Sequence, residues 1–446
     1  MKNMKVLLCQ GYLGSPSLGK PIVFPLGLAY IASSIKAEHE VYCWDPNIAQ
    51  NPMSELPRLL EKIEPQVVGL SLRNVDSSLY ADHESYYLQF VSFLKIIREK
   101  LPYCKIVVGG AGFSLFAEEI MSRNSEIDFG VVFEGEQSFA QLLRNMDHPE
   151  RVNNLVFRKN GRICFTEPKY IENFEASAFP SRELFNLKEY RKKPYSINLM
   201  TKRGCEFHCI FCPNAFISGC RYRLRSPKNV VDEIEQMKNY FELDNYYFAD
   251  STFNYPYDYA RKVCQELAAR KLGTDWTADF TPAFMNESFI KEAVQSGCSM
   301  FDFSPDGASD NALAALRKGI CMKDIKKTIS SVKKVEGARA TFNFMYDLPR
   351  YNSEHIAGLT RLIPQMECSL REKLSGIYIT KIRIYPHSQL YNLAVKEKII
   401  SKDTSILYPT YYSSASFSSK VENVIADLSG KSCIVISKLK GGLIKS

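Results

Sequence analysis

Residues 201–214 read Thr-Lys-Arg-Gly-Cys-Glu-Phe-His-Cys-Ile-Phe-Cys-Pro-Asn, and the architecture can be worked out from this stretch. Its cysteines, Cys205, Cys209 and Cys212, have the spacing Cys-x3-Cys-x2-Cys, so their thiolates can turn toward one metal centre. A cubane [4Fe–4S] cluster normally takes four thiolates, and a loop with three leaves one iron open to an external ligand. A structural zinc site is the alternative, but zinc needs a fourth ligand such as His208 or Cys220.

The sequence around this loop alternates between short strands and amphipathic helices. Strands are predicted at 196–201, 245–248, 275–280, 300–304, 340–346 and 376–384, and helices at 229–241, 258–270, 287–296, 310–318, 323–335 and 353–365. Six β/α units predict a partial (β/α)6 barrel over residues 195–400, open on one side, with its site at the carboxyl ends of the strands. A zinc site would not explain this pattern.

The first third of the chain has a similar α/β pattern. Strands are predicted at 5–9, 40–44, 67–72, 105–108 and 129–133, with helices at 26–37, 53–63, 86–99, 115–121 and 138–146. This pattern predicts a Rossmann-like, flavodoxin-like domain over residues 1–147. We interpret residues 148–194, which include a short hairpin, as a linker, and residues 401–446 as a small C-terminal appendage.

The composition indicates a folded protein and excludes several classes. Hydrophobic residues make up 45% and charged residues 24% of the chain, and no apolar run is long enough for a membrane span. The formal net charge is +8, but the basic residues are spread along the chain and predict no nucleic-acid binding. The 13 cysteines, in a chain whose start lacks a signal-peptide core, favour metal or redox use over disulfides and a cytoplasmic location.

The cysteine loop, with aromatic Phe211 before its last cysteine, resembles that of the radical S-adenosylmethionine (SAM) superfamily. The resemblance continues through Phe-Ala-Asp-Ser-Thr-Phe-Asn at 248–254 and Phe-Ser-Pro-Asp-Gly-Ala-Ser-Asp at 303–310, and covers roughly residues 195–400. It implies that Cys205, Cys209 and Cys212 hold a [4Fe–4S] cluster that cleaves SAM to a 5′-deoxyadenosyl radical. It also implies SAM contacts from Phe211, Asp250, Ser251, Ser304 and Asp306.

The first domain resembles the cobalamin-binding domain found upstream of radical SAM barrels. The resemblance rests on Val-Gly-Leu-Ser at 68–71, Val-Val-Gly-Gly at 107–110 and Phe-Glu-Gly-Glu at 133–136. It implies cobalamin contacts from Ser71, Gly109, Gly110, Glu134 and Gly135, and by position Arg73 could approach the corrin. The Asp-x-His-x-x-Gly signature is absent, so no histidine at that position can ligate the cobalt.

Together, the two resemblances imply a cobalamin-dependent radical SAM enzyme that most simply methylates an unactivated carbon. The substrate would be a small molecule, a lipid or a peptide, and the cluster would need a flavodoxin- or ferredoxin-like electron donor. Two alternatives stay open at this point. One is rearrangement or cyclisation without methyl transfer, and the other is a non-catalytic cobalamin or metal sensor.

Overall fold

The computed structural model describes residues 3–13, 22–78, 80, 84–414 and 434–436. The chain divides into two compact units. The first comprises Met1–Ser77, Glu84–Ile197 and Ile217–Gly219, and the second comprises Ser78–His83, Asn198–Phe216 and Cys220–Ser446. Within the described part of the chain, no helix is both long and apolar enough to cross a membrane.

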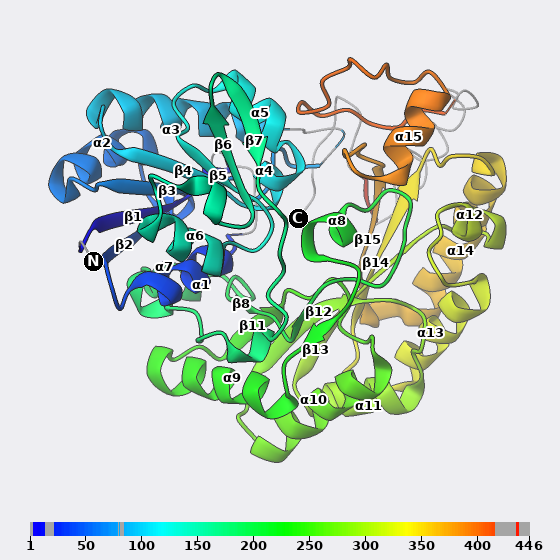
Figure 1. Ribbon diagram of the computed structural model, residues 1–446. Helices are drawn as coiled ribbons and strands as arrows, with labels where there is room; N and C mark the ends of the chain where they lie inside the picture. The colour runs from blue at the N-terminus through cyan, green and yellow to red at the C-terminus, as the bar shows by residue number, and fades with distance from the viewer. Residues whose placement is uncertain (1–2, 14–21, 79, 81–83, 415–433, 437–446) are drawn as a thin grey trace. The chain divides into compact units, whose positions relative to one another are not determined.

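The first unit contains a seven-stranded sheet in the order β2-β1-β3-β4-β5-β6-β7 (Figure 1). Its strands are β1 (Lys5–Gln10), β2 (Glu40–Trp44), β3 (Val67–Ser71), β4 (Lys105–Gly109), β5 (Phe129–Val131), β6 (Leu155–Lys159) and β7 (Arg162–Phe165). The first five pair in parallel. Their order is that of flavodoxin-like folds, in which ligands bind beyond the carboxyl ends of the strands beside the β1/β3 switch point. The predicted fold class of this domain is confirmed.

Helices cover both faces of the first sheet. They are α1 (Leu26–Ile35), α2 (Pro52–Ile63), α3 (Tyr86–Lys100), α4 (Ala111–Leu115), α5 (Ala117–Arg123) and α6 (Gly135–Arg144), followed by α7 (Leu187–Arg191). The residues Val6 to Cys9 of β1 are fully buried. A strand in the middle of a parallel sheet is buried on both faces, which is why this segment reads as an unbroken apolar run.

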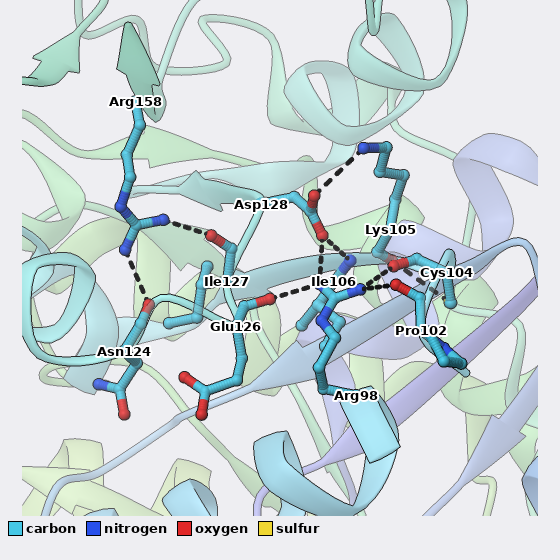
Figure 2. Close-up of polar contacts among 10 residues, drawn as sticks. All are labelled: Arg98, Pro102, Cys104, Lys105, Ile106, Asn124, Glu126, Ile127, Asp128 and Arg158. Carbon is cyan, nitrogen blue, oxygen red and sulfur yellow. Dashed lines mark hydrogen bonds and ion pairs between the residues drawn. The ribbon is translucent and has the colours of Figure 1, made fainter. Parts of the chain in front are cut away.

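Ion pairs and carbonyl contacts close the amino end of this sheet (Figure 2). Asp128, just before β5, accepts hydrogen bonds from Arg98 at 2.7 Å and from the backbone N–H of Ile106 at 2.9 Å. Lys105 lies 3.2 Å from the other carboxylate oxygen of Asp128. Arg158 of β6 donates to the carbonyl of Ile127 at 2.5 Å. These contacts hold the starts of β4 and β5 to the end of β6, which runs antiparallel to β5.

The interpretation of residues 148–194 as a linker needs correction, because its hairpin belongs to the first sheet. Strand β6 pairs antiparallel with β5, and β7 pairs antiparallel with β6. Leu155 and Val156 are fully buried. The hairpin was recognisable from its turn at Asn160 and Gly161, but local sequence does not specify which edge a hairpin joins.

The second unit contains a parallel seven-stranded sheet in the order β16-β15-β14-β13-β12-β11-β8. Its strands are β8 (Asn198–Leu199), β11 (Asn245–Phe248), β12 (Asp275–Phe280), β13 (Cys298–Asp306), β14 (Ala340–Tyr346), β15 (Leu374–Lys381) and β16 (Ile434–Ile436). All six expected strands are present, and those at 245–248, 275–280 and 340–346 have the expected bounds. The predicted partial barrel is confirmed.

Helices follow the strands of the second unit, and the larger ones lie along the outer face of its sheet (Figure 1). They are α9 (Pro227–Phe241), α10 (Tyr257–Arg270), α11 (Glu287–Gln295), α12 (Asp310–Ala315), α13 (Met322–Lys334), α14 (Asn352–Leu370) and α15 (Gln389–Lys396). Phe248, Trp276 and Phe280 are almost fully buried and pack edge to face or tilted against Phe253. This aromatic layer holds successive strands of the barrel together.

Part of the expected C-terminal appendage belongs to the barrel. Strand β16 pairs in parallel with β15 and adds a seventh strand. The backbone N–H of Ile384 donates to Thr410, and that of Tyr412 donates to Ile382. A strand of three residues gives too weak a periodic signal to be predicted from sequence. Residues 415–433 and 437–446 lie outside the described residues.

Candidate active site

The cysteine loop lies at the carboxyl end of the barrel, directly after β8. A short antiparallel pair, β9 (Lys202–Arg203) with β10 (Arg223–Leu224), brackets it, and helix α8 (Asn214–Ser218) follows the last cysteine. Gly204 has a φ of 93°, a left-handed conformation that glycine adopts at little cost. Ile210 is anchored on both sides, because its N–H donates to Leu316 at 3.1 Å and its carbonyl accepts from Leu390 at 2.8 Å.

The structure brings the three predicted cluster cysteines together. Cys205 is buried and Cys209 and Cys212 are half-buried. Burial is the main cause that raises the pKa of Cys212 to about 12, and the neighbouring sulfurs of Cys209 and Cys205 contribute to the rise. Burial also raises the pKa of Cys209, and Lys318 opposes that shift. A bound cationic centre would remove this penalty, since metal coordination ionises thiols.

The three thiols are the donors that an iron–sulfur cluster takes. Among the described residues, no group of three or more His, Cys, Asp or Glu side chains could hold one metal ion. In a cubane cluster each thiolate binds a different iron, so the sulfurs need not converge on one point. The donor set and its arrangement therefore fit a [4Fe–4S] cluster.

Two of the predicted SAM contacts, Asp250 and Asp306, form buried ion pairs with lysines. Lys202 Nζ lies 2.9 Å from Asp250 Oδ2, and the two side chains are 1% and 0% exposed. Lys318 Nζ lies 2.5 Å from Asp306 Oδ2, with 14% and 5% exposed. Thr201 also donates its N–H and hydroxyl to Asp250, at 2.9 and 2.5 Å. These carboxylates support the cluster loop and its surroundings, and whether they also contact SAM stays a prediction.

The other predicted SAM residues lie close to the cysteines or on the inner face of the barrel. Ser251 donates its hydroxyl to the carbonyl of Gly204 at 3.1 Å, which ties it to the start of the cysteine loop. The ring of half-buried Phe211 faces the ammonium of Lys318 at 5.7 Å. Ser304 on β13 lies within 3.4 Å of Asn343. Their contacts with SAM stay predictions.

The inner face of the barrel carries a group of polar side chains that was not predicted from the sequence. Asp279 and Asp302 are paired residues of β12 and β13. Tyr247 donates its hydroxyl to Asp279, while Asn343 donates to Asp302 at 2.5 Å. Burial, together with the charge of Asp302, raises the pKa of Asp279 to about 7. This polar face could have been predicted from the sequence, because polar residues alternate with aromatic ones in residues 275–280 and 298–306.

The first unit places the predicted cobalamin residues at the carboxyl end of its sheet. Ser71 ends β3 and is half-buried. A Cβ on Gly110, whose φ is 101°, would lie 3.1 Å from Ser71 Oγ and 2.6 Å from the carbonyl oxygen of Leu72. Only glycine fits there. Within the described residues the Ser71 hydroxyl has no hydrogen-bond partner, so it can bind a ligand at the edge where a flavodoxin-like fold places one. The contact of Ser71 and Gly110 with cobalamin stays a prediction.

Three other predicted cobalamin contacts have structural partners. The Glu134 carboxylate accepts the backbone N–H of Ile171 at 2.6 Å, which anchors the segment after the hairpin. A Cβ on Gly135 would lie 3.2 Å from Ile31, so this glycine lets α6 pack on α1. Arg73 is exposed, and its carbonyl accepts from Gly112 at 2.8 Å. Gly109 is also in a tight place, since a Cβ there would lie 3.3 Å from the carbonyl oxygen of Val131.

Two family models match this chain. The radical SAM superfamily model matches residues 199–363, which contain the three cysteines. The B12 binding domain model matches residues 20–143 of the first unit. The chain contains a radical SAM domain and a B12-binding domain. It is therefore a radical SAM enzyme, and the sensor alternative has no support. These domains imply a [4Fe–4S] cluster, SAM and cobalamin as cofactors.

Curated relatives of this radical SAM enzyme include methyltransferases and cyclases. An uncharacterized methyltransferase of Pyrococcus horikoshii is 24% identical over 382 residues, 84% of this chain and 79% of the relative. The cytidylyl-2-hydroxyethylphosphonate methyltransferase of Streptomyces wedmorensis is 22% identical over 66% of this chain. The anaerobic magnesium-protoporphyrin IX monomethyl ester cyclase of Cereibacter sphaeroides is 25% identical over 70% of it. The chain spans 63% and 52% of these last two relatives.

Solved structures of cobalamin-dependent radical SAM enzymes share the fold. The methyltransferase TsrM from Kitasatospora setae, solved with cobalamin and a [4Fe–4S] cluster, superimposes with a TM-score of 0.77 at 18% identity, over 91% of this chain and 80% of that one. Another TsrM structure contains tryptophan substrate and a SAM analogue. OxsB, with aqua-cobalamin and SAM, gives a TM-score of 0.74 at 16% identity, over 95% of this chain and 66% of that one.

Proposed function

We propose that this radical SAM enzyme is a cobalamin-dependent methyltransferase that acts on an unactivated carbon of a small molecule. The observation that carries the proposal is the loop of three buried or half-buried thiols at the carboxyl end of a parallel barrel, in a chain that also has a B12-binding domain. Relatives named as methyltransferases support it. The tryptophan bound to TsrM makes a small molecule the leading substrate class, ahead of a lipid or a peptide.

Each part of the site has a defined task in this proposal. Cys205, Cys209 and Cys212 would hold the cluster with one iron open for SAM. The cluster would supply the electron that cleaves SAM, and methylcobalamin would supply the methyl group. Buried aromatic layers exclude water from the barrel, which protects a radical from side reactions. The polar inner face with Tyr247, Asp279 and Asn343 offers hydrogen bonds to a substrate.

The proposal extends to an electron donor and a location. Repeated reduction of the cluster requires a flavodoxin- or ferredoxin-like protein. We place the enzyme in the cytoplasm, where free thiols stay reduced and can bind iron.

The test is anaerobic reconstitution with iron, sulfide and hydroxocobalamin, followed by reduction in the presence of SAM labelled in its methyl group. We expect 5′-deoxyadenosine, stoichiometric bound cobalamin and labelled methylcobalamin. The matched control is the variant Cys205→Ala/Cys209→Ala/Cys212→Ala, which keeps the B12-binding domain and should bind cobalamin without forming deoxyadenosine.

The outcomes separate the competing reactions. Deoxyadenosine without bound cobalamin would contradict the cobalamin-dependent reaction, and no deoxyadenosine from the wild type would contradict the enzyme itself. Once a substrate is found, the product mass distinguishes methylation, which adds one CH2, from rearrangement or cyclisation, the reaction class of the relative named as a cyclase.

A further inference from the structure

Buried lysines flank the cluster thiols on two sides, and neither was expected to have a role. Lys202 lies near the thiol of Cys205, whereas Lys318 lies near the thiols of Cys209 and Cys212. Each lysine is paired with a carboxylate, Asp250 for the first and Asp306 for the second. A buried cation next to a metal cluster must influence the cluster electrostatically, because the surrounding medium screens charge poorly.

The two lysines have different surroundings. Lys202 Nζ also donates to the carbonyl of Phe253 at 3.2 Å. It lies 5.7 Å from the rings of Tyr222, Phe253 and Tyr259. Several partners therefore interact with its charge. Burial lowers the pKa of Lys202 despite its carboxylate neighbour.

Lys318 has a simpler environment. Among the described residues its ion-pair partner is Asp306, and its ammonium faces the ring of Phe211 in the cysteine loop. The Asp306 carboxylate oxygen, 2.5 Å from Lys318 Nζ, stabilises the charged form of this ammonium. Asp306 is the negative charge that offsets it.

The backbone is held in an unusual conformation to place Asp306. Its φ is 65°, a left-handed conformation uncommon outside glycine. The pairing of β13 with β14 shifts register between Phe303 and Asp306. Left-handed residues of this kind persist where the surrounding structure requires them, often at functional sites. Here the result is a carboxylate directed at Lys318.

We propose that the Lys318–Asp306 pair sets the reduction potential of the [4Fe–4S] cluster. Reduction adds one negative charge to the cluster, and the Lys318 ammonium stabilises that charge while Asp306 limits the effect. Charge near a cluster is a recognised determinant of its potential. This inference rests on the cluster being held by Cys205, Cys209 and Cys212, and it does not depend on which group the enzyme transfers.

The test is an EPR-monitored redox titration of the reconstituted cluster without SAM, with iron content measured for each variant. Lys318→Met should shift the midpoint potential to more negative values, and Asp306→Asn, which tolerates the left-handed backbone, should shift it to more positive values. Lys318→Arg keeps the charge and should stay near the wild type. Lys326→Met, which removes an exposed lysine of α13, is the matched control and should not shift the potential.

Opposite shifts are the signature of a charge effect, because a merely structural role would not reverse sign between the two partners. Shifts in the same direction, or no shift relative to Lys326→Met, would overturn the proposal. Loss of the cluster in all Lys318 and Asp306 variants would also overturn it, because the pair would then be structural. Failure of methyl transfer with opposite potential shifts intact would leave this inference standing and contradict only the proposed function.

Discussion

The guanidinium of Arg225 lies 2.5 Å from the carboxylate of Glu233, and the two side chains are 2% and 0% exposed. Arg225 also donates to the carbonyl of Met200 at 2.8 Å and to the side chain of Asn229 at 2.7 Å. These bonds connect the chain after β10 to the segment before β9 and to helix α9. The pair therefore stabilises the two segments that flank the cysteine loop.

Removing one member of this pair should destabilise the protein strongly. Arg225→Met would leave a buried carboxylate without its cation, which costs about 3 to 5 kcal/mol. Chemical denaturation of the apoprotein measures the effect. The double variant Arg225→Met/Glu233→Leu should recover part of the loss. Lys228→Met, which breaks the exposed pair with Asp232, is the control and should cost less than about 1 kcal/mol. If Arg225→Met and Lys228→Met lowered the free energy of unfolding equally, the proposed stabilising role of the Arg225–Glu233 pair would be contradicted.

Loss of one cluster cysteine should abolish cluster assembly. Cys209→Ser replaces a thiolate by a weak ligand, so we expect the absorption and EPR signals of the reduced cluster to disappear and deoxyadenosine formation to fall by more than about 100-fold. Cys321→Ser changes an exposed cysteine outside the loop and should keep both signals. A full cluster in Cys209→Ser would disprove the assignment.

The stability of the protein should depend on pH through Asp279. Burial raises the pKa of Asp279 in the folded state to about 7, above its ordinary value of 3.8. Between these values the unfolded carboxyl loses its proton first, so the free energy of unfolding should fall as pH rises from about 4 to about 7 and level off above that. The expected contribution is about 4 kcal/mol, because each pKa unit is worth about 1.4 kcal/mol.

A comparison of variants isolates this contribution. Asp279→Asn should remove that part of the pH dependence and be more stable than the wild type at pH 8, as measured by denaturation across the pH range. Asp275→Asn, at the exposed start of the same strand, should keep the wild-type profile. A difference between Asp279→Asn and wild type that does not vary with pH would refute the raised pKa.

A methyl group at Gly110 should destabilise the first unit. The new Cβ would lie 2.6 Å from the carbonyl oxygen of Leu72, so the backbone must move. Gly161 also has a positive φ, of 75°, but has nothing within 4 Å of its Cβ position. Gly110→Ala should therefore cost about 1 to 3 kcal/mol more than Gly161→Ala, which carries the conformational strain alone.

Cobalamin retention provides a second measurement for the same pair. Gly110→Ala should retain less cobalamin after gel filtration, since the displaced backbone lies beside Ser71, whereas Gly161→Ala should retain as much as the wild type. Equal retention in the two variants would place the cofactor away from this edge of the sheet.

The sequence by itself predicted most of the helices and strands, and the three cysteines proposed to hold the cluster. The strands 245–248, 275–280 and 340–346 were predicted with the bounds they have, because apolar runs between turn residues are local signals. Cys205, Cys209 and Cys212 could be identified for the same reason, since all three lie within one short loop. The family resemblance rests on similarly local motifs.

Tertiary structure alone decided what the charged residues do. Asp250 was expected to contact SAM, but its partner Lys202 lies 48 positions away in the chain. Lys318 and Asp306 meet only because β13 ends in a left-handed residue beside the cysteine loop. Likewise, the pairing of the 155–165 hairpin with β5 and the addition of β16 depend on which edges are free. A local pattern shows that a residue is polar or apolar, whereas its partner and burial arise from contacts that form only when distant segments pack together.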